Sequence, residues 1–484
     1  MIRIIKSTVW TYFLCDTGEE LDIVKEKLTF DQIIPAYKAR HAKRKKKNYL
    51  FKMHDNKMVV FSGLTERIVK VCEDAEIEFQ LENRSEKLEP ILSPQYTEII
   101  SRLRPYQIDA LEALEKANGG ILWMATNAGK TEVAGALLHL FSESRVLYLV
   151  HRKELLTQTI ARFKDKFGIE AGELSSEKME VDKRVVVAMI NTAYSRRDRL
   201  SKKFGYFDMV VMDECQHAAG KMASTVISLC TSAAFRVGLT GTLPQDLYKK
   251  LSVIRLFGDV RYRITNDTMI KDGWSSPAKV FMVQGSWGTN VAETIKQAFA
   301  TELRNQHLAW KKRVKVSLWH DVYQEAFVHN EKRNEAIATA TVSCAGDGVL
   351  IFVEYVEHGS ILAEQTGLPF VSAGSVDREE KFNQFKQGSI RGLITSPILE
   401  EGVDISRIRY LIMAGGKKSE IKLLQRVGRG LRKDKEKKKV TIIDFFDDEV
   451  PMLRKHTEER LKVYTAEGFP IEKVTLTEVK TRKL

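Results

Sequence analysis

Two short segments contain residues whose types and spacing suit phosphate chemistry. Residues 124–131, Met-Ala-Thr-Asn-Ala-Gly-Lys-Thr, follow an apolar run and end like a phosphate-binding loop. Residues 208–214 form a second apolar run, which ends in two carboxylates, Asp213 and Glu214. A lysine can reach phosphate oxygens, a hydroxyl and a carboxylate can hold Mg²⁺, and a second carboxylate can activate water. Together the two segments predict binding and hydrolysis of a nucleoside triphosphate.

Each of these residues has a predicted role. Lys130 contacts the β- and γ-phosphates, Thr131 and Asp213 bind Mg²⁺, and Glu214 orients and deprotonates the attacking water. The loop residues predicted to line the nucleotide are Thr126, Asn127, Ala128 and Gly129. Asn127 stands where glycine is frequent, and asparagine tolerates left-handed backbone geometry. The alternative is a chance Gly-Lys-Thr string and two acids that open a surface turn.

Composition limits the class of protein. The chain has 484 residues, 43% of them hydrophobic, which allows about three domains. Its formal net charge of +13 favours a polyanion such as nucleic acid, with plain solubility as the alternative. Five scattered cysteines argue against a disulfide framework and fit a reducing cytoplasm. We find no secretory leader and no apolar run of membrane-spanning length, so we expect a cytoplasmic protein with no membrane partner.

The order of apolar runs predicts the fold class. Residues 1–95 mix strand-like and helix-like segments and predict a small α/β domain. Beyond them, apolar strands alternate with helices in two successive series, which is typical of doubly wound parallel sheets. We therefore expect an α/β protein with two tandem parallel-sheet domains at 96–255 and 256–450. The second range includes a connector, and 451–484 is expected to form a C-terminal helical extension.

Four segments occur in the order found in a known family of motors. They are Gly-Lys-Thr, Asp-Glu-x-x-His, residues 240–242 (Thr-Gly-Thr) and residues 425–432 (Gln-Arg-Val-Gly-Arg-Gly-Leu-Arg). In this order they resemble superfamily 2 helicases, which implies two RecA-like domains and ATP-driven movement on nucleic acid. By this resemblance Arg429 and Arg432 are arginine fingers that stabilise charge on the transferring phosphoryl group. Gln425 then lies beside the nucleotide.

Weaker matches to the same family extend the predicted site. Tyr106 and Gln107 resemble the segment that reads adenine, so ATP is expected rather than GTP. Gly402 and Asp404 resemble residues beside the nucleotide, with Asp404 near the ribose. Six residues resemble contacts to the sugar–phosphate backbone of nucleic acid: Arg152, Thr192, Ser372, Gly374, Thr395 and Ser396. The value of these matches lies in their collective order.

The N-terminal region narrows the resemblance to UvsW-type phage helicases, although residues 1–95 carry no strict motif. The resemblance implies remodelling of branched DNA: fork regression, Holliday-junction branch migration, R-loop removal and duplex unwinding in phage replication, recombination and repair. Branched or forked DNA and single-stranded DNA are the expected partners. The motor is expected to act as a monomer in the host cytoplasm, and a single-strand binding protein or a recombinase is a further partner that the resemblance allows.

A basic run is predicted to form a second contact to DNA. Five consecutive residues are predicted to contact phosphates in a salt-dependent way: Lys43, Arg44, Lys45, Lys46 and Lys47. The alternative is a solvated basic loop. Tyr49 and Phe51 follow this run and either stack on bases or fill a core, and core is the better interpretation for Phe51.

Three other functions stay open on the sequence. The same motor could act on RNA. It could be the motor part of a restriction or nuclease complex, with a partner chain supplying the nuclease. It could also be a binding protein with an inactive ATPase site, although the lysine, the two acids and the two arginines that hydrolysis needs are all present.

Overall fold

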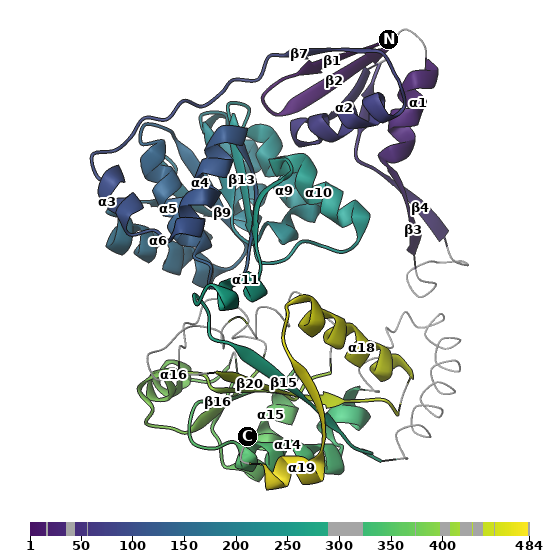
Figure 1. Cartoon of the computed structure of the whole chain (residues 1–484). Helices are drawn as coiled ribbons and strands as arrows, with labels where there is room; N and C mark the ends of the chain where they lie inside the picture. The colour runs from purple at the N-terminus through teal and green to yellow at the C-terminus, as the bar shows by residue number, and fades with distance from the viewer. Residues whose placement is uncertain are drawn as a thin grey trace. The chain divides into compact units, whose positions relative to one another are not determined.

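The computed structural model describes residues 1–15, 18–34, 44–55, 57–288, 323–372, 374–396, 407–416, 428, 439–449 and 451–482. The chain divides into two compact units, Met1–Ile264 and Thr265–Leu484. The first unit holds a small N-terminal domain and a larger parallel sheet, and the second unit holds another parallel sheet (Figure 1). The predicted fold class, two parallel-sheet α/β domains after a small α/β domain, is confirmed.

The small domain is built on a five-stranded sheet in the order β5-β6-β2-β1-β7. Its strands are β1 (Ile2–Lys6), β2 (Trp10–Cys15), β5 (Lys52–His54), β6 (Lys57–Phe61) and β7 (Phe79–Asn83). Its helices are α1 (Gly18–Lys27) and α2 (Thr65–Asp74). Leu21, Val24 and Leu28 recur at helical spacing and are all buried.

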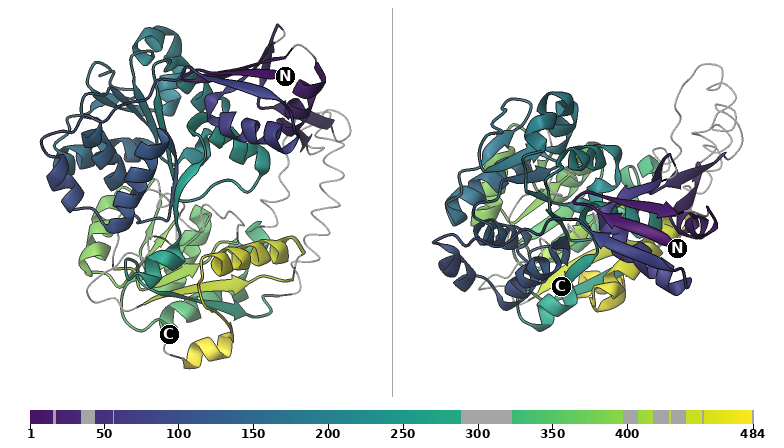
Figure 2. Two further views of the ribbon diagram at one scale, coloured as in Figure 1. Left: turned by 45° about the horizontal axis from the view of Figure 1, so that its top comes forward. Right: turned by 90° about the horizontal axis from the view of Figure 1, so that it is seen from above.

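A β-hairpin stands apart from this sheet. Strands β3 (Thr29–Ile34) and β4 (Arg44–Tyr49) pair only with each other, in antiparallel register from Thr29 opposite Tyr49 to Ile34 opposite Arg44. The views in Figure 2 show the hairpin extending away from the small sheet. Arg44, Lys45, Lys46 and Lys47 therefore lie on a strand, while Lys43 lies outside the described residues.

The larger sheet of the first unit has seven parallel strands in the order β10-β11-β9-β12-β13-β8-β14. The strands are β8 (Gly119–Met124), β9 (Val146–Val150), β10 (Gly172–Leu174), β11 (Val185–Met189), β12 (Met209–Met212), β13 (Phe235–Thr240) and β14 (Val260–Ile264). Continuous apolar runs such as Val-Leu-Tyr-Leu-Val suit strands that are buried on both faces.

Helices cover both faces of this sheet. They are α3 (Tyr96–Ser101), α4 (Pro105–Ala117), α5 (Lys130–Leu140), α6 (Lys153–Phe167), α7 (Ile190–Ser195), α8 (Arg197–Phe204), α9 (Lys221–Leu229) and α10 (Leu247–Phe257). Figure 1 shows α4, α5 and α6 on one side of the sheet and α9 and α10 on the other. Because the helices cover the faces of the sheet, the carboxyl ends of its strands stay uncovered, and such sheets bind ligands at this edge.

The small domain packs against α10 of the larger sheet through a short 3-10 turn, η2 (Ser62–Leu64). A Cβ atom on Gly63 would stand 2.5 Å from the carbonyl oxygen of Ile254, so only glycine fits there. Arg236 of β13 donates to the carbonyl of Thr8 at 3.1 Å and to the hydroxyl of Ser62. Burial lowers the pKa of Arg236 to about 10.

The second unit repeats the parallel arrangement in the order β17-β18-β16-β19-β20-β15-β21. The strands are β15 (Ala278–Gln284), β16 (Val349–Phe352), β17 (Phe370–Val371), β18 (Gly392–Thr395), β19 (Tyr410–Met413), β20 (Val440–Phe446) and β21 (Ile471–Thr475). The described helices of eight or more residues are α14 (Glu331–Ser343), α15 (Val356–Thr366), α16 (Arg378–Gln387) and α18 (Pro451–Ala466); α11 (Asn266–Lys271) and α19 (Leu476–Thr481) are shorter.

Two strands of this sheet differ from the sequence interpretation. Residues 451–484 are not simply a helical extension, because β21 pairs with β15 and forms an edge of the sheet. β15 lies in the part of 256–450 expected to hold a connector and helices, yet it is a strand that pairs with both β20 and β21. Both segments pair with residues far away in the sequence, so local patterning did not reveal them. Among the described helices, none is both long enough and apolar enough to cross a bilayer.

Candidate active site

The motifs of the first unit meet at the carboxyl edge of its sheet. Three neighbouring strands, β12, β13 and β8, end in the acidic pair, the Thr-Gly-Thr segment and the phosphate loop. Parallel pairing puts these ends side by side: Met212 pairs with Gly238, and Thr240 pairs with Trp123. The sequence separates these motifs widely, and the sheet brings them together.

The phosphate loop has the backbone geometry of an anion cradle. Asn127 and Gly129 both adopt left-handed conformations, with φ of 75° and 79°, and Gly129 caps the N-terminus of α5. The left-handed geometry that asparagine tolerates is therefore present at Asn127. A side chain on Gly129 would overlap the amide of Gln107. The loop thus presents the start of an eleven-residue helix to whatever binds there.

Lys130 begins α5, directly after the phosphate loop. Its Nζ donates to the carbonyl of Met124 at 3.3 Å, a long bond that a phosphate oxygen can replace. The Thr-Gly-Thr segment lies close to the Lys130 ammonium group, since a Cβ on Gly241 would lie 3.7 Å from Lys130 Nζ. The indole of Trp123 donates to the carbonyl of Gly241 at 3.1 Å and fixes this approach.

Gln107 contacts the phosphate loop rather than open space. Its Nε2 donates to the carbonyl of Ala128 at 2.9 Å, and its Oε1 accepts from the backbone of Arg104 at the start of α4. Neighbouring Tyr106 is buried, and its hydroxyl accepts from the Arg104 guanidinium at 2.9 Å. Both ends of the Gln107 amide are therefore occupied. The predicted contact to adenine requires Gln107 to break these two hydrogen bonds. The adenine role of Tyr106 and Gln107 stays a prediction.

The surroundings of the acidic pair shift the pKa of Asp213 and hold Glu214 in an uncommon backbone conformation. Asp213 is 9% exposed, and burial together with the charge of Glu214 raises its pKa to about 6. Lys130 opposes that rise, which places the lysine within electrostatic reach of the carboxylate. Glu214 adopts a left-handed conformation at φ 49°, uncommon for a residue with a side chain. Such strain is typical of residues that their surroundings hold in a functional geometry.

Gln216 is a residue of the site that the sequence analysis missed. Its Nε2 donates to Glu214 Oε2 at 2.7 Å, while its Oε1 accepts from the hydroxyl of Thr240 at 2.6 Å. Thr240 Oγ1 also accepts from the backbone N–H of Thr242 at 3.0 Å. One buried amide therefore connects the predicted general base to the Thr-Gly-Thr segment. The Asp-Glu-x-x-His pattern specifies His217 but leaves position 216 open, so it does not indicate a role for Gln216.

His217 takes a different position. It is exposed, and its ring lies over that of His151, with centroids 4.3 Å apart. The residues that the structure describes contain no group of three or more His, Cys, Asp or Glu side chains placed to hold a metal ion. Thr131 and Asp213 stay the residues predicted to bind a Mg²⁺ ion that arrives with a nucleotide.

The predicted nucleic-acid contacts of the first unit lie beside the nucleotide motifs. Arg152 follows β9 and Thr192 follows β11, and these two strands pair with Val150 opposite Met189. β9 in turn pairs with β12, which carries the acidic pair. Arg152 and Thr192 are both partly exposed. One edge of one sheet therefore carries both kinds of predicted contact.

In the second unit the described motif residues also lie at strand ends. Ser372 follows β17, Thr395 ends β18 and Ser396 follows it, with Ser396 donating its backbone N–H to Val371. Gly374 is exposed, with open space where a side chain would be. Thr395 is fully buried, and its hydroxyl donates to the carbonyl of Ser396 at 3.0 Å. A phosphate contact by Thr395 therefore requires that bond to open.

Several predicted residues lie outside the described part of the chain: Lys43, Gly402, Asp404, Gln425, Arg429 and Arg432. Arg44, Lys45, Lys46 and Lys47 belong to β4.

Comparisons with known proteins agree with the geometry. Residues 100–245 match the family of the type III restriction enzyme res subunit, and residues 333–434 match the helicase conserved C-terminal domain. The ATP-dependent DNA helicase uvsW of Enterobacteria phage T4 is 23% identical over 464 residues, covering 86% of this chain and 87% of that protein. The DNA 3'-5' translocase XPB2 of Sulfurisphaera tokodaii is 25% identical over 368 residues, covering 70% of this chain and 81% of that protein.

A solved structure of Dbp5 from S. cerevisiae, bound to RNA and ADP BeF3, shares the fold with a TM-score of 0.55 at 12% identity. The match covers 81% of this chain and 98% of that one. The phosphate loop, the acidic pair and the Thr-Gly-Thr segment all fall within residues 100–245. The chain belongs to the superfamily 2 helicases, which hydrolyse ATP.

Proposed function

We propose that this protein is an ATP-dependent DNA translocase that remodels branched DNA. The observation that carries the proposal is the single sheet edge on which nucleotide motifs and nucleic-acid motifs lie on adjacent strands, β8, β13, β12, β9 and β11. Because these motifs lie on adjacent β-strands, a change at the nucleotide can alter the contacts to a nucleic-acid strand. The similarity to the phage T4 DNA helicase, over 86% of this chain, supports DNA as the substrate.

The chemistry follows from the residues at that edge. Glu214 accepts a proton from water as the water oxygen attacks the γ-phosphorus, and the bond to the bridging oxygen of ADP breaks. Lys130 neutralises charge on the β- and γ-phosphates. A Mg²⁺ ion held by Thr131 and Asp213 would supply further neutralisation there. Arg429 and Arg432 are proposed to stabilise the transferring phosphoryl group.

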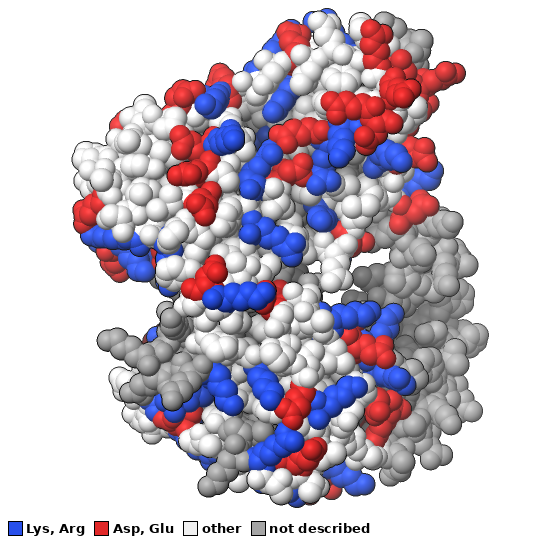
Figure 3. Space-filling view, in the orientation of Figure 1, with Lys and Arg blue, Asp and Glu red and all other residues white. Residues whose placement is uncertain are grey.

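We propose that the β3–β4 hairpin is a second contact to DNA. Its strand β4 carries Arg44, Lys45, Lys46 and Lys47. Tyr49 ends the same strand and is 51% exposed, whereas Phe51 packs against the buried core. An exposed aromatic ring beside basic residues suits base stacking next to phosphate contacts. On the face in Figure 3, basic and acidic side chains are interspersed, so the charge of +13 is not gathered in one patch there.

The first test is ATP hydrolysis with no nucleic acid, single-stranded DNA, a forked duplex, a four-way junction and RNA. The Glu214→Gln variant serves as the blank. We expect the largest stimulation with forked or four-way DNA. Stimulation by RNA alone would instead make the protein an RNA helicase, and equal stimulation by all DNA forms would remove the branched-DNA part of the proposal.

The match of residues 100–245 to a restriction-enzyme subunit favours a second candidate, the motor of a restriction complex. That candidate predicts ATP-dependent movement on unbranched duplex DNA and DNA cleavage once a nuclease partner is added. A triplex-displacement assay on linear duplex DNA separates the two. Displacement without any preference for junctions would favour the restriction motor.

A further inference from the structure

Trp123, the last residue but one of β8, connects the phosphate loop to the Thr-Gly-Thr segment. Its indole Nε1 donates to the carbonyl of Gly241 at 3.1 Å. A Cβ on Gly241 would lie 3.4 Å from Thr126 Oγ1 and 3.7 Å from Lys130 Nζ, so the Gly241 backbone lies directly against the phosphate loop. The hydrogen bond from Trp123 therefore holds the Thr-Gly-Thr segment beside the lysine that is predicted to contact phosphate.

Trp123 also lies in a row of residues that crosses three neighbouring strands. In the parallel register it pairs with Thr240 of β13 on one side and with Arg263 of β14 on the other. The Thr240 hydroxyl donates to Gln216 Oε1, and the Gln216 amide donates to Glu214. The row therefore leads from the predicted general base to β14, the last strand of the first unit.

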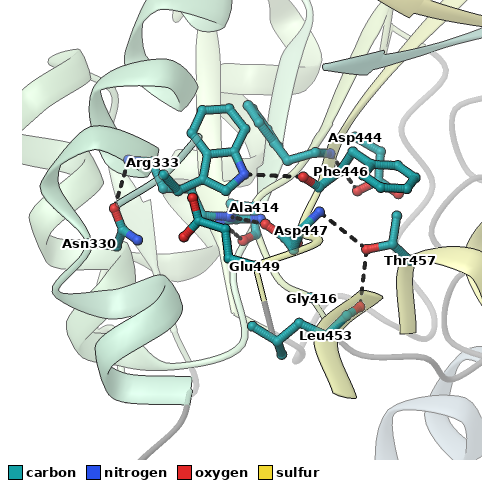
Figure 4. A network of polar contacts seen from close by, with 12 residues as sticks. Asn330, Arg333, Ala414, Gly416, Asp444, Phe446, Asp447, Glu449, Leu453 and Thr457 are labelled. Atoms are coloured by element: carbon teal, nitrogen blue, oxygen red, sulfur yellow. Dashed lines mark hydrogen bonds and ion pairs between the residues drawn. The ribbon is translucent and has the colours of Figure 1, made fainter. Parts of the chain in front are cut away.

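Arg263 lies over the Trp123 ring, with its guanidinium carbon 4.2 Å from the ring centroid. Its side chain is exposed, and among the described residues no carboxylate forms an ion pair with it. Arg333 of the second unit differs: it lies over the Phe327 ring at 4.4 Å, but its Nε also lies 2.8 Å from Asp447 Oδ1 (Figure 4). The indole face attracts a cation more strongly than other aromatic rings do. The contact between Arg263 and Trp123 therefore orients both side chains.

We propose that Trp123 and Arg263 are positioning residues for ATP hydrolysis. Trp123 holds Gly241 against the phosphate loop, and Arg263 holds the Trp123 ring in the orientation in which its N–H reaches Gly241. Neither residue has to touch the nucleotide for this role. The inference rests on the proposed role of Lys130, and it does not depend on which nucleic acid the protein acts on.

The first variant is Trp123→Phe, which keeps an aromatic ring beside Arg263 but removes the N–H that reaches Gly241. We expect kcat for ATP to fall by roughly threefold to tenfold, the effect of one lost hydrogen bond. KM for ATP should stay close to the wild-type value, since residues 126–131 of the loop are unchanged.

The second pair of variants tests the cation. Arg263→Gln removes the positive charge from the ring and should lower kcat in the same way, whereas Arg263→Lys keeps the charge and should stay nearer to the wild type. Arg145→Gln is the matched control. Arg145 also lies over an aromatic ring, 5.9 Å from the centroid of Tyr206, but it stands just before β9, at the amino edge of the same sheet. Its kcat should match the wild-type value.

A double-mutant cycle separates positioning from stability, because a buried indole N–H usually finds an acceptor whatever its function. Arg263→Gln is also made in the Trp123→Phe background, and unfolding temperatures are measured for all variants. If Arg263 acts through the indole N–H, its replacement lowers kcat no further once that N–H is gone.

Three results would overturn the inference: an equal loss of kcat from Arg263→Gln in both backgrounds, an unchanged kcat in Trp123→Phe, or losses of kcat that only follow the unfolding temperature. Lys130→Ala tests the site assignment separately. If that variant hydrolyses ATP at the wild-type rate, the assigned role of Lys130 is wrong, and the inference falls with it.

Discussion

At the scale of single residues, the site depends on how a few polar groups hold one another. Glu214 is strained at φ 49° and accepts a hydrogen bond from the buried amide of Gln216. That amide accepts in turn from Thr240. A hydrogen bond to one carboxylate oxygen fixes the orientation of the carboxylate and therefore the direction from which it can accept a proton. The orientation of the predicted general base is therefore set by Gln216, which Thr240 holds in turn.

Replacing Gln216 with leucine should lower kcat for ATP by roughly tenfold or more, because the volume is kept while Glu214 and Thr240 lose their shared partner. Steady-state ATP hydrolysis at saturating DNA is the measurement. Gln158→Leu is the matched control, since Gln158 is an exposed glutamine on α6, and its rate should change little. Equal losses in the two variants would remove the special role of Gln216.

Asp213 should make the stability of the first unit depend on pH. Its pKa of about 6 lies above its ordinary value of 3.8, so the folded protein disfavours the ionised form. The destabilisation is absent below about pH 4, grows as the pH rises toward 6 and is complete above it. Asp213→Asn should therefore raise the unfolding temperature by a few degrees at pH 7.5 and by less at pH 4.5. A gain that does not depend on pH would contradict the assigned pKa.

The same carboxylate should control Mg²⁺-dependent nucleotide binding. Below about pH 6 the nucleotide-free protein carries a protonated Asp213, which cannot bind a cation. Affinity for ATP in the presence of Mg²⁺ should weaken as the pH falls through this range, while affinity in EDTA changes less. Titration with a fluorescent ATP analogue from pH 5 to pH 8 measures both. Parallel curves with and without Mg²⁺ would exclude Asp213 as a metal ligand.

At the scale of elements, the phosphate loop shows why similar backbone angles do not make residues interchangeable. Asn127 and Gly129 both have left-handed geometry, but only Gly129 faces the amide of Gln107. Gly129→Ala therefore adds an overlap to the cost of about 1–2 kcal/mol that left-handed geometry imposes on a residue with a side chain. We expect it to abolish ATP binding in calorimetry, while Asn127→Gly keeps binding near the wild-type level. Comparable binding by both variants would contradict the geometry.

The hairpin makes an electrostatic prediction. Changing Lys45, Lys46 and Lys47 to alanine should weaken binding to forked DNA and flatten its salt dependence, by about 0.7–0.9 in the log–log slope for each phosphate that the protein no longer neutralises. Fluorescence anisotropy at several salt concentrations measures the slope. Three exposed lysines elsewhere in the first unit, Lys116, Lys202 and Lys221, form the matched control. An unchanged slope would return the basic run to a solvated surface.

The sequence predicted elements best where the pattern is local. Continuous apolar runs indicated the parallel strands, and Gly-Lys-Thr, the two acids and Thr-Gly-Thr all lie at carboxyl ends of strands. The pairing of β21 with β15 and the hydrogen bond between Gln216 and Thr240 depend on residues distant in the chain. No local period reveals such pairings. The roles of individual site residues stay predictions for the same reason, since the interactions that define them involve a ligand.

At the scale of the whole molecule, the small domain contacts the strand that leads into the Thr-Gly-Thr segment. Arg236 binds the small domain at one end of β13, and the Thr-Gly-Thr segment begins at the other. Gly63→Ala should loosen this attachment, because its Cβ would press on the C-terminal turn of α10. Limited proteolysis should then cut between residues 84 and 95 faster than in the wild type, with ATP binding unchanged. Unchanged proteolysis would mean that the hydrogen bonds of Arg236 are sufficient to hold the domain.

The place of β21 has a consequence for how the protein is made. The sheet of the second unit begins with β15, and β21 covers the edge of β15 only after every other strand of the sheet has been synthesised. Until the ribosome releases residues 471–475, β15 keeps an unpaired edge that can recruit another chain. Premature termination shortly before these residues would yield an aggregation-prone protein rather than a partly active motor. A chain that ends before residue 471 is therefore expected to keep the edge of β15 unpaired.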